Sequence, residues 1–202
     1  MLFKTPKLLQ YIYPKLIWKT EKSIQLTFDD GPIPEVTEFV LDTLSKFDVK
    51  ATFFCIGANV RKHPEVFLKA VEGGHKIGNH SMHHLNGWKT STAAYVKDVN
   101  DCQQEIELLY NRDKKLFRPP YGRITRAQIE KLIPSYDIMM WSTLSQDYDK
   151  NISLEKCLKG TLRATRQNSI VLFHDSLKAK KNMAYVLPKY LESLLKKGYT
   201  FN

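Results

Sequence analysis

The 202-residue sequence predicts an α/β fold, either a doubly wound sheet or a small, irregular barrel. Short apolar runs typical of strands alternate with segments of helical spacing along the chain, as they do in parallel βα units. Polar residues able to do chemistry follow several of these runs, where parallel folds place their ligand sites. With 43% hydrophobic residues the chain can bury a core, so we expect one domain.

The predicted elements follow from the spacing of apolar residues and from turn residues between them. Strands are predicted at residues 24–28, 50–54, 75–79, 115–118, 137–142 and 169–173, with a weaker candidate at 199–202. Helices are predicted at residues 34–47, 64–72, 91–110, 125–132, 154–166 and 182–197. Pro64 at a helix start and Gly198 after a helix end are typical of such boundaries.

Residues 1–22 are expected to form a packed N-terminal arm ahead of a single domain at 23–202. Gln10, Pro14 and Lys15 interrupt the apolar residues of the arm, and no small-residue cleavage site follows. We therefore expect neither a membrane span nor a signal peptide, which favours a cytoplasmic protein. A weak helix at a membrane surface is the alternative for the arm, with peripheral membrane or cell-envelope association.

The chain carries a formal net charge of +10, which favours contact with polyanions but does not bear on the fold. Residues 176–202 contain six lysines and one acidic residue, Glu192. We interpret this segment as a solvated helix face, because its lysines are not interleaved with exposed aromatic residues. We expect no specific nucleic-acid partner, and a polyanion-binding protein remains the alternative class.

Two adjacent carboxylates, Asp29 and Asp30, follow the first predicted strand and precede a Gly31-Pro32 turn. Neighbouring strand residues point to opposite sides, but such a turn can bring both carboxylates into one cavity. Two clustered anions repel each other, which favours a bound cation or a shared proton. A solvated turn is the simpler interpretation of this pair taken alone.

Histidines follow the third predicted strand at His80, His83 and His84. The i,i+4 spacing of His80 and His84 would place both imidazoles on one face of a helical turn, where they could bind one metal ion. One carboxylate of the Asp29-Asp30 pair would complete a set with positions open for water and substrate. His83 is the competing ligand.

Arg118 and His174 follow two further predicted strands. Arg118 precedes a stiff Pro-Pro-Tyr-Gly turn, and its guanidinium can anchor a carboxylate. His174 ends a hydrophobic strand and is a candidate acid or base, although a hydrogen-bonded core histidine fits equally well in isolation.

Together these motifs resemble those of the polysaccharide deacetylases, the family with the NodB homology domain that is also called carbohydrate esterase family 4. The matching segments are TFDDGP at 27–32, HSMHH at 80–84, RPPYG at 118–122 and LFH at 172–174. Four motifs in the family's order span most of the chain, so chance agreement is not a serious competitor.

The resemblance implies a distorted seven-stranded (β/α) barrel for the domain. It also implies one divalent metal ion, with zinc as the first choice and cobalt, nickel or iron as alternatives. The implied metal ligands are Asp30, His80 and His84. Leu172 would line a pocket for the acetyl group, and Trp141 is a candidate wall of that pocket, with plain core packing as the alternative.

The same resemblance implies a catalytic role for three other side chains and one backbone group. Asp29 would be the base, Arg118 would orient Asp29, and His174 would be the general acid. The backbone N–H of Tyr121 would help to hold the oxyanion. The implied protein is a metal-dependent hydrolase that removes N-acetyl groups from amino sugars of a polysaccharide or oligosaccharide, by metal-activated water.

One family motif departs from the pattern. The fourth motif, D-x-x-D-[WY], reads LSQDY at residues 144–148, so Leu144 replaces the aspartate that helps to tune the acid histidine in the family. We predict that Asp147 takes over this role for His174, because Asp175 directly follows the histidine and would point away.

Two alternatives to N-deacetylation remain open from the sequence. The same site would permit an esterase that acts on O-acetylated sugars. The change at Leu144 also suggests a catalytically weakened member that binds a glycan or another polyanion. In each case we expect an acetylated glycan as the partner and a monomeric protein.

Overall fold

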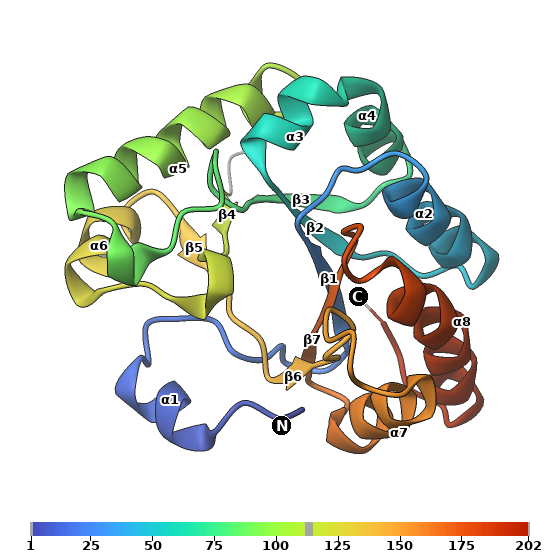
Figure 1. Cartoon of the computed structure of the whole chain (residues 1–202). Helices are drawn as coiled ribbons and strands as arrows, with labels where there is room; N and C mark the ends of the chain where they lie inside the picture. Colours follow the sequence, from blue (N-terminus) through green and yellow to red (C-terminus); the bar gives the residue numbers. More distant parts are fainter. Residues whose placement is uncertain (1, 112–114, 202) are drawn as a thin grey trace.

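The computed structural model describes residues 2–111 and 115–201, whose strands form one curled sheet with helices around it (Figure 1). All seven strands are parallel, in the order β5-β4-β3-β2-β1-β7-β6. Their bounds are β1 Gln25–Asp29, β2 Thr52–Cys55, β3 Lys76–Asn79, β4 Leu116–Phe117, β5 Asp137–Ile138, β6 Thr143–Leu144 and β7 Ile170–His174. The predicted distorted (β/α) barrel is confirmed, and the doubly wound alternative is excluded.

Eight helices are formed by the described residues, and six of them, α2 and α4 to α8, correspond to the predicted helices, whereas α1 and α3 were not predicted. Their bounds are α1 Lys7–Ile12, α2 Val36–Lys46, α3 Gly57–Lys62, α4 Pro64–Glu72, α5 Thr92–Glu107, α6 Arg126–Leu132, α7 Leu154–Ala164 and α8 Lys180–Lys196. Short 3₁₀ turns lie at η1 Gly87–Lys89 and η2 Pro120–Gly122. No helix in the described ranges is long and apolar enough to span a bilayer.

The seventh strand is not where the sequence analysis placed it. Residues 199–201 form no strand, and Phe201 makes only an isolated bridge to Ile24, while Asn202 lies outside the described residues. The seventh strand is β6, which the prediction had overlooked beyond the end of the 137–142 run. It is two residues long and depends on pairing with β7, so it has no alternation pattern of its own.

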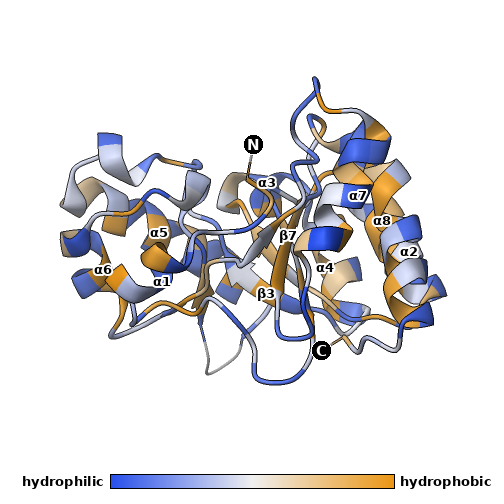
Figure 2. Ribbon diagram, turned by 90° about the horizontal axis from the view of Figure 1, so that it is seen from below, coloured by the Kyte–Doolittle hydropathy of each residue, from blue (hydrophilic) through white to orange (hydrophobic). Residues whose placement is uncertain are grey.

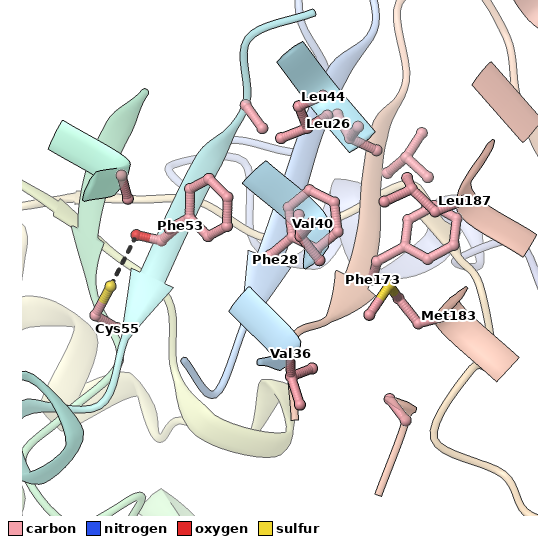
Figure 3. Close-up of a cluster of buried hydrophobic side chains, with 14 of the residues drawn as sticks. Leu26, Phe28, Val36, Val40, Leu44, Phe53, Cys55, Phe173, Met183 and Leu187 are labelled. Carbon is pink, nitrogen blue, oxygen red and sulfur yellow. Dashed lines mark hydrogen bonds between the residues drawn. The ribbon is translucent and has the colours of Figure 1, made fainter. Parts of the chain in front are cut away.

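The residues of β1 alternate between an outer apolar layer and a polar barrel interior. Leu26 and Phe28 belong to the main hydrophobic cluster, where they pack with residues of α2, α8 and β7 (Figure 3). Gln25, Thr27 and Asp29 are equally buried, but they bind polar partners inside the barrel. The interior is therefore polar where the sheet ends, and this polar layer carries the site.

The helices pack their apolar faces against the sheet. In Figure 2, β7 is coloured as hydrophobic, while the surrounding helices show both hydrophobic and hydrophilic residues. The amphipathic pattern on which the helix predictions depended thus corresponds to burial against the strands. The sheet remains open between its edge strands β5 and β6, and part of the N-terminal arm lies between them (Figure 1).

Candidate active site

A cavity of about 620 Å³ opens at the carboxyl ends of the strands. Eight of the ten residues named from the sequence line it: Asp29, Asp30, His80, His84, Tyr121, Trp141, Leu172 and His174. The other two, Arg118 and Asp147, are fully buried behind this wall, and each contacts one of the lining residues. Five separate strand ends and turns thus converge on one space.

The turn after β1 separates the two adjacent carboxylates. Asp29 ends the strand and is 3% exposed, whereas Asp30 has a φ of +85°, in the left-handed region. A Cβ at Gly31 would lie 2.0 Å from a carboxylate oxygen of Asp175, so only glycine fits there. The tight turn lets both carboxylates face the cavity, as the sequence analysis expected of the Gly-Pro turn.

The side chain of Asp175 stabilises this turn by hydrogen bonds. Its carboxylate accepts hydrogen bonds from the Gly31 N–H at 3.1 Å and from the Thr37 hydroxyl at 2.6 Å. Burial raises the pKa of Asp175 to about 8. Asp175 therefore holds the β1 turn and forms no hydrogen bond to the imidazole of His174.

The histidine segment after β3 is a tight turn and not a helix, which corrects the expected geometry. Ser81 and His84 both have positive φ values, of +62° and +56°, which a helical segment does not contain. The imidazoles of His80 and His84 still face each other, with ring centroids 5.0 Å apart. Their Nε2 atoms lie 3.8 and 3.3 Å from the same oxygen, Oδ1 of Asp30.

The hydrogen bonds of His80 determine which nitrogen is available to a ligand. Its Nδ1 lies 2.8 Å from the carbonyl oxygen of Arg118, which can only accept, so Nδ1 carries the proton. Nε2 then keeps its lone pair and faces Asp30. Burial lowers the pKa of His80 to about 3, so the imidazole is neutral at physiological pH.

His84 is held in a similar way by Tyr121. Its Nδ1 lies 3.1 Å from the phenolic oxygen, which can accept a hydrogen bond from a protonated Nδ1. In that tautomer Nε2 keeps its lone pair. Burial also lowers the pKa of His84. Both histidines therefore present neutral nitrogen atoms to the same point as Asp30.

His83, the competing ligand, points out of the cavity. Its side chain is 62% exposed, and its Nδ1 lies 2.6 Å from Oδ1 of Asp98 on α5. The second oxygen of Asp98 accepts the backbone N–H groups of Met82 and His83. Asp98 thus shapes the histidine turn from a position that the sequence analysis missed.

Arg118 is fully buried and contacts Asp29 inside the barrel. Its guanidinium donates to Oδ1 of Asp29 at 2.8 Å and to the carbonyl groups of Met139 and Met140 at 3.0 Å. Burial raises the pKa of Asp29 even though the guanidinium opposes this shift. The second oxygen, Oδ2, lies 3.7 Å from Nε2 of His80, on the side of the candidate ligands.

His174 ends β7 beside Asp29, the last residue of β1, and contacts Asp147, as the sequence analysis predicted. Nδ1 of His174 lies 2.8 Å from Oδ1 of Asp147, and the His174 N–H donates to Oδ2 at 2.7 Å. The Ser145 hydroxyl also donates to the buried carboxylate. Burial disfavours the imidazolium, but the charge and hydrogen bond of Asp147 outweigh it and raise the pKa of His174 to about 9.

The remaining predicted residues form the rim and floor of the cavity. Tyr121 has a φ of +59°, an uncommon backbone conformation for a residue other than glycine. Trp141 packs over Gly122, where a Cβ would lie 2.7 Å from the indole ring. Leu172 and Leu144 add apolar surface to the same space.

The donor set fits a metal ion. One carboxylate oxygen and two neutral imidazole nitrogens, from Asp30, His80 and His84, lie within 4.8 Å of one another. Two histidines and one carboxylate suit first-row divalent ions and leave coordination positions for other molecules.

Comparison with known proteins shows the family of the chain. The family model "Polysaccharide deacetylase" matches residues 18–134, more than half of the chain. A peptidoglycan-N-acetylglucosamine deacetylase of Bacillus cereus is 34% identical over 183 residues, which cover 90% of this chain and 85% of that protein. The chain spans less than half the length of several other peptidoglycan deacetylases, from Listeria monocytogenes and Bacillus subtilis.

Solved structures share the fold across nearly the whole chain. The Bc1960 peptidoglycan N-acetylglucosamine deacetylase, crystallised with a benzamide compound, has a TM-score of 0.89 and 28% identity, covering 98% of this chain and 94% of that one. A Bacillus anthracis protein described as a carbohydrate esterase family 4 pseudoenzyme has a TM-score of 0.82 and 24% identity, covering 92% and 66%. The fold is therefore shared by a protein described as a deacetylase and by one described as a pseudoenzyme.

Proposed function

The chain belongs to the polysaccharide deacetylase family, and on that premise we propose that it is a metal-dependent hydrolase that removes N-acetyl groups from amino sugars of a glycan. The observation that carries this proposal is the meeting, in one cavity, of a candidate metal site with the Asp29 carboxylate and the Asp147-paired imidazole of His174. The metal ligands and the two proton-transfer groups, Asp29 and His174, would supply different parts of the reaction.

Asp30, His80 and His84 would hold the metal ion. When bound, a divalent ion of this kind supplies a Lewis acid and lowers the pKa of water. Zinc is the first choice because neutral imidazole and carboxylate are common zinc ligands, and cobalt, nickel or iron are alternatives.

Asp29 would accept the proton of the attacking water. Arg118 fixes one oxygen of the carboxylate and leaves the other directed to the cavity. The raised pKa of Asp29 makes this carboxylate a better proton acceptor than an exposed one. The attack converts the planar acetyl carbon into a tetrahedral centre with a negative oxygen, which the Tyr121 N–H would help to stabilise.

His174 would donate a proton to the leaving nitrogen as the carbon–nitrogen bond breaks. The imidazolium needed for this step is stabilised by Asp147 behind it. Acetate and a free amino sugar are the products. Leu172 would pack against the acetyl methyl group, and Trp141 would close the same pocket.

Relatives of the chain are described as peptidoglycan deacetylases, so N-acetylated peptidoglycan strands are the first substrate to test. An O-acetyl sugar esterase is the second candidate, because an ester carbonyl presents the same geometry to the cavity. Its leaving alcohol needs less help from an acid than an amine does, so the protonated state of His174 favours the amide substrate.

Acetate release from N-acetylated and O-acetylated oligosaccharides separates these functions. The purified chain is assayed after treatment with EDTA and after addition of Zn²⁺, Co²⁺ or Ni²⁺. We expect acetate from the N-acetylated substrates only when a metal ion is present. Release from O-acetyl groups alone would favour the esterase, and binding of glycan without acetate release under any condition would show a pseudoenzyme.

A further inference from the structure

The N-terminal arm is built into the open side of the barrel. On one edge, the Ile17 N–H donates to the carbonyl of Ile138 in β5 at 2.9 Å. On the other, the N–H of Leu144 in β6 donates to the carbonyl of Phe3, also at 2.9 Å. A Cβ at Gly160 of α7 would lie 2.3 Å from the Phe3 ring, so glycine there makes room for the arm.

The arm forms one wall of a second cavity, of about 370 Å³, beside the catalytic one. Tyr121, Arg123, Trp141 and Leu144 line both cavities, so the two spaces adjoin. The volume lies within the range of small-molecule sites. The arm contributes Lys4 and Leu9, among other residues, and these two precede the residues matched by the family model, 18–134.

Aromatic and cationic side chains line this second cavity. Trp88 is part of the lining, with the Arg123 guanidinium 5.2 Å from its ring centre. Aromatic faces of this kind pack against the apolar C–H faces of sugar rings, while polar groups at the edge set orientation. Lys4 and Arg123 supply positive charge, and no acidic residue is among the described residues of the lining.

Resting on the proposed function, we propose that the arm completes a second glycan subsite, which binds the sugar adjoining the one deacetylated when that sugar carries a carboxylate. The aromatic wall holds the ring of the adjoining sugar, and Lys4 and Arg123 pair with its acidic group. The shared residues keep the chain of sugars continuous between the two cavities. An acyl chain, which would need no cations, is the competing occupant.

Two disaccharides of equal length test the charge preference. One contains two N-acetylglucosamine units, and the other contains N-acetylglucosamine joined to N-acetylmuramic acid, which adds one lactyl carboxylate. Affinities for the full chain are measured by calorimetry in EDTA, which stops turnover. The arm offers matched controls, since Lys4 and Leu9 line the cavity whereas their neighbours Lys7 and Leu8 do not.

We expect the carboxylate-bearing disaccharide to bind more tightly than the neutral one. Leu9→Ser should weaken binding of both about fivefold, since the apolar contact of Leu9 with the bound sugar is lost, and Leu8→Ser should leave both unchanged. Lys4→Gln should weaken only the acidic disaccharide, by about threefold, and Lys7→Gln neither.

Equal affinity for the two disaccharides in the unsubstituted chain, or equal losses within either matched pair, would overturn the assignment. Displacement of both sugars by a fatty acid with no preference between the disaccharides would assign the cavity to an acyl chain. Because binding is measured without turnover, a failure to release acetate in the separate assay would refute the proposed function and leave this subsite standing.

Discussion

His80 is buried and His174 is half-buried in the lining of the same cavity, yet their surroundings move their pKa values in opposite directions. Nδ1 of His80 contacts a backbone carbonyl, that of Arg118, and the pKa of His80 falls to about 3. Nδ1 of His174 contacts the carboxylate of Asp147, and the pKa of His174 rises to about 9.

The difference shows what decides the role of a buried histidine. Burial disfavours the imidazolium at both positions. A carbonyl dipole fixes the tautomer of His80 but does not compensate for lost hydration, so the ring stays neutral and can ligate a metal ion. A full negative charge at Asp147 does compensate, so His174 keeps its proton and can act as an acid.

The largest effect on activity is expected from substitution of a candidate metal ligand. His84→Ala should remove most of the bound metal and reduce kcat/KM more than about 100-fold, because the Lewis acid contributes several kcal/mol. His83→Ala is the matched control, since His83 is exposed and pairs with Asp98. Metal content measured by elemental analysis should separate the variants, and equal content in both would exclude the proposed ligand set.

The two adjacent carboxylates should also differ in function: Asp29 should accept a proton, and Asp30 should bind the metal ion. Asp29→Asn should retain metal and lower kcat by about 10²- to 10⁴-fold, since only the proton acceptor is lost. Asp30→Asn should lose affinity for the metal itself. Metal titration of both variants checks this, and the reverse pattern would mean that the two roles are exchanged.

For the proposed general acid, His174→Gln should lower kcat by about 10²- to 10⁴-fold while metal content stays at the level of the unsubstituted chain. His80→Gln should instead lose the metal. Parallel measurement of metal content and turnover would sharpen the comparison between the two histidines. Loss of metal from both variants would show that His174 also contributes to metal binding and would contradict the separate roles of the two histidines.

The smallest effect concerns the tuning of His174. Asp147→Asn keeps a hydrogen-bond acceptor but removes the charge, so the pKa of His174 should fall. Because the acid must be protonated to act, the basic limb of the kcat/KM profile should move to lower pH, with about tenfold less activity at neutral pH. Leu144→Asp should move the limb the other way. An unchanged limb in a folded, metal-loaded Asp147→Asn protein would show that Asp147 does not tune His174.

Much of this site could be predicted because its residues stand directly after strands. A parallel sheet collects the carboxyl ends of its strands at one edge, so local motifs around Asp29, His80 and His174 are enough to bring them together. Asp147 could be inferred because a replaced aspartate, at Leu144, left few acidic candidates near the motif.

Other features left no local pattern in the sequence. The strand β6 is too short for periodicity, and α3 has only six residues. Asp98 supports the histidine turn from the middle of α5, a contact that depends on tertiary packing. The pairing of the arm with both sheet edges likewise joins residues more than 100 positions apart.

The most direct test of the account is a pH titration of the histidine side chains in the metal-free protein, observed by long-range ¹H–¹⁵N NMR spectra. His174→Gln and His80→Gln variants assign the two resonances. The account predicts that His174 carries both protons until the pH rises through about 9, whereas His80 remains neutral with its proton on Nδ1 throughout the folded range. A His174 that loses its proton near the ordinary pKa of 6.5, or a His80 that is charged at neutral pH, would contradict it.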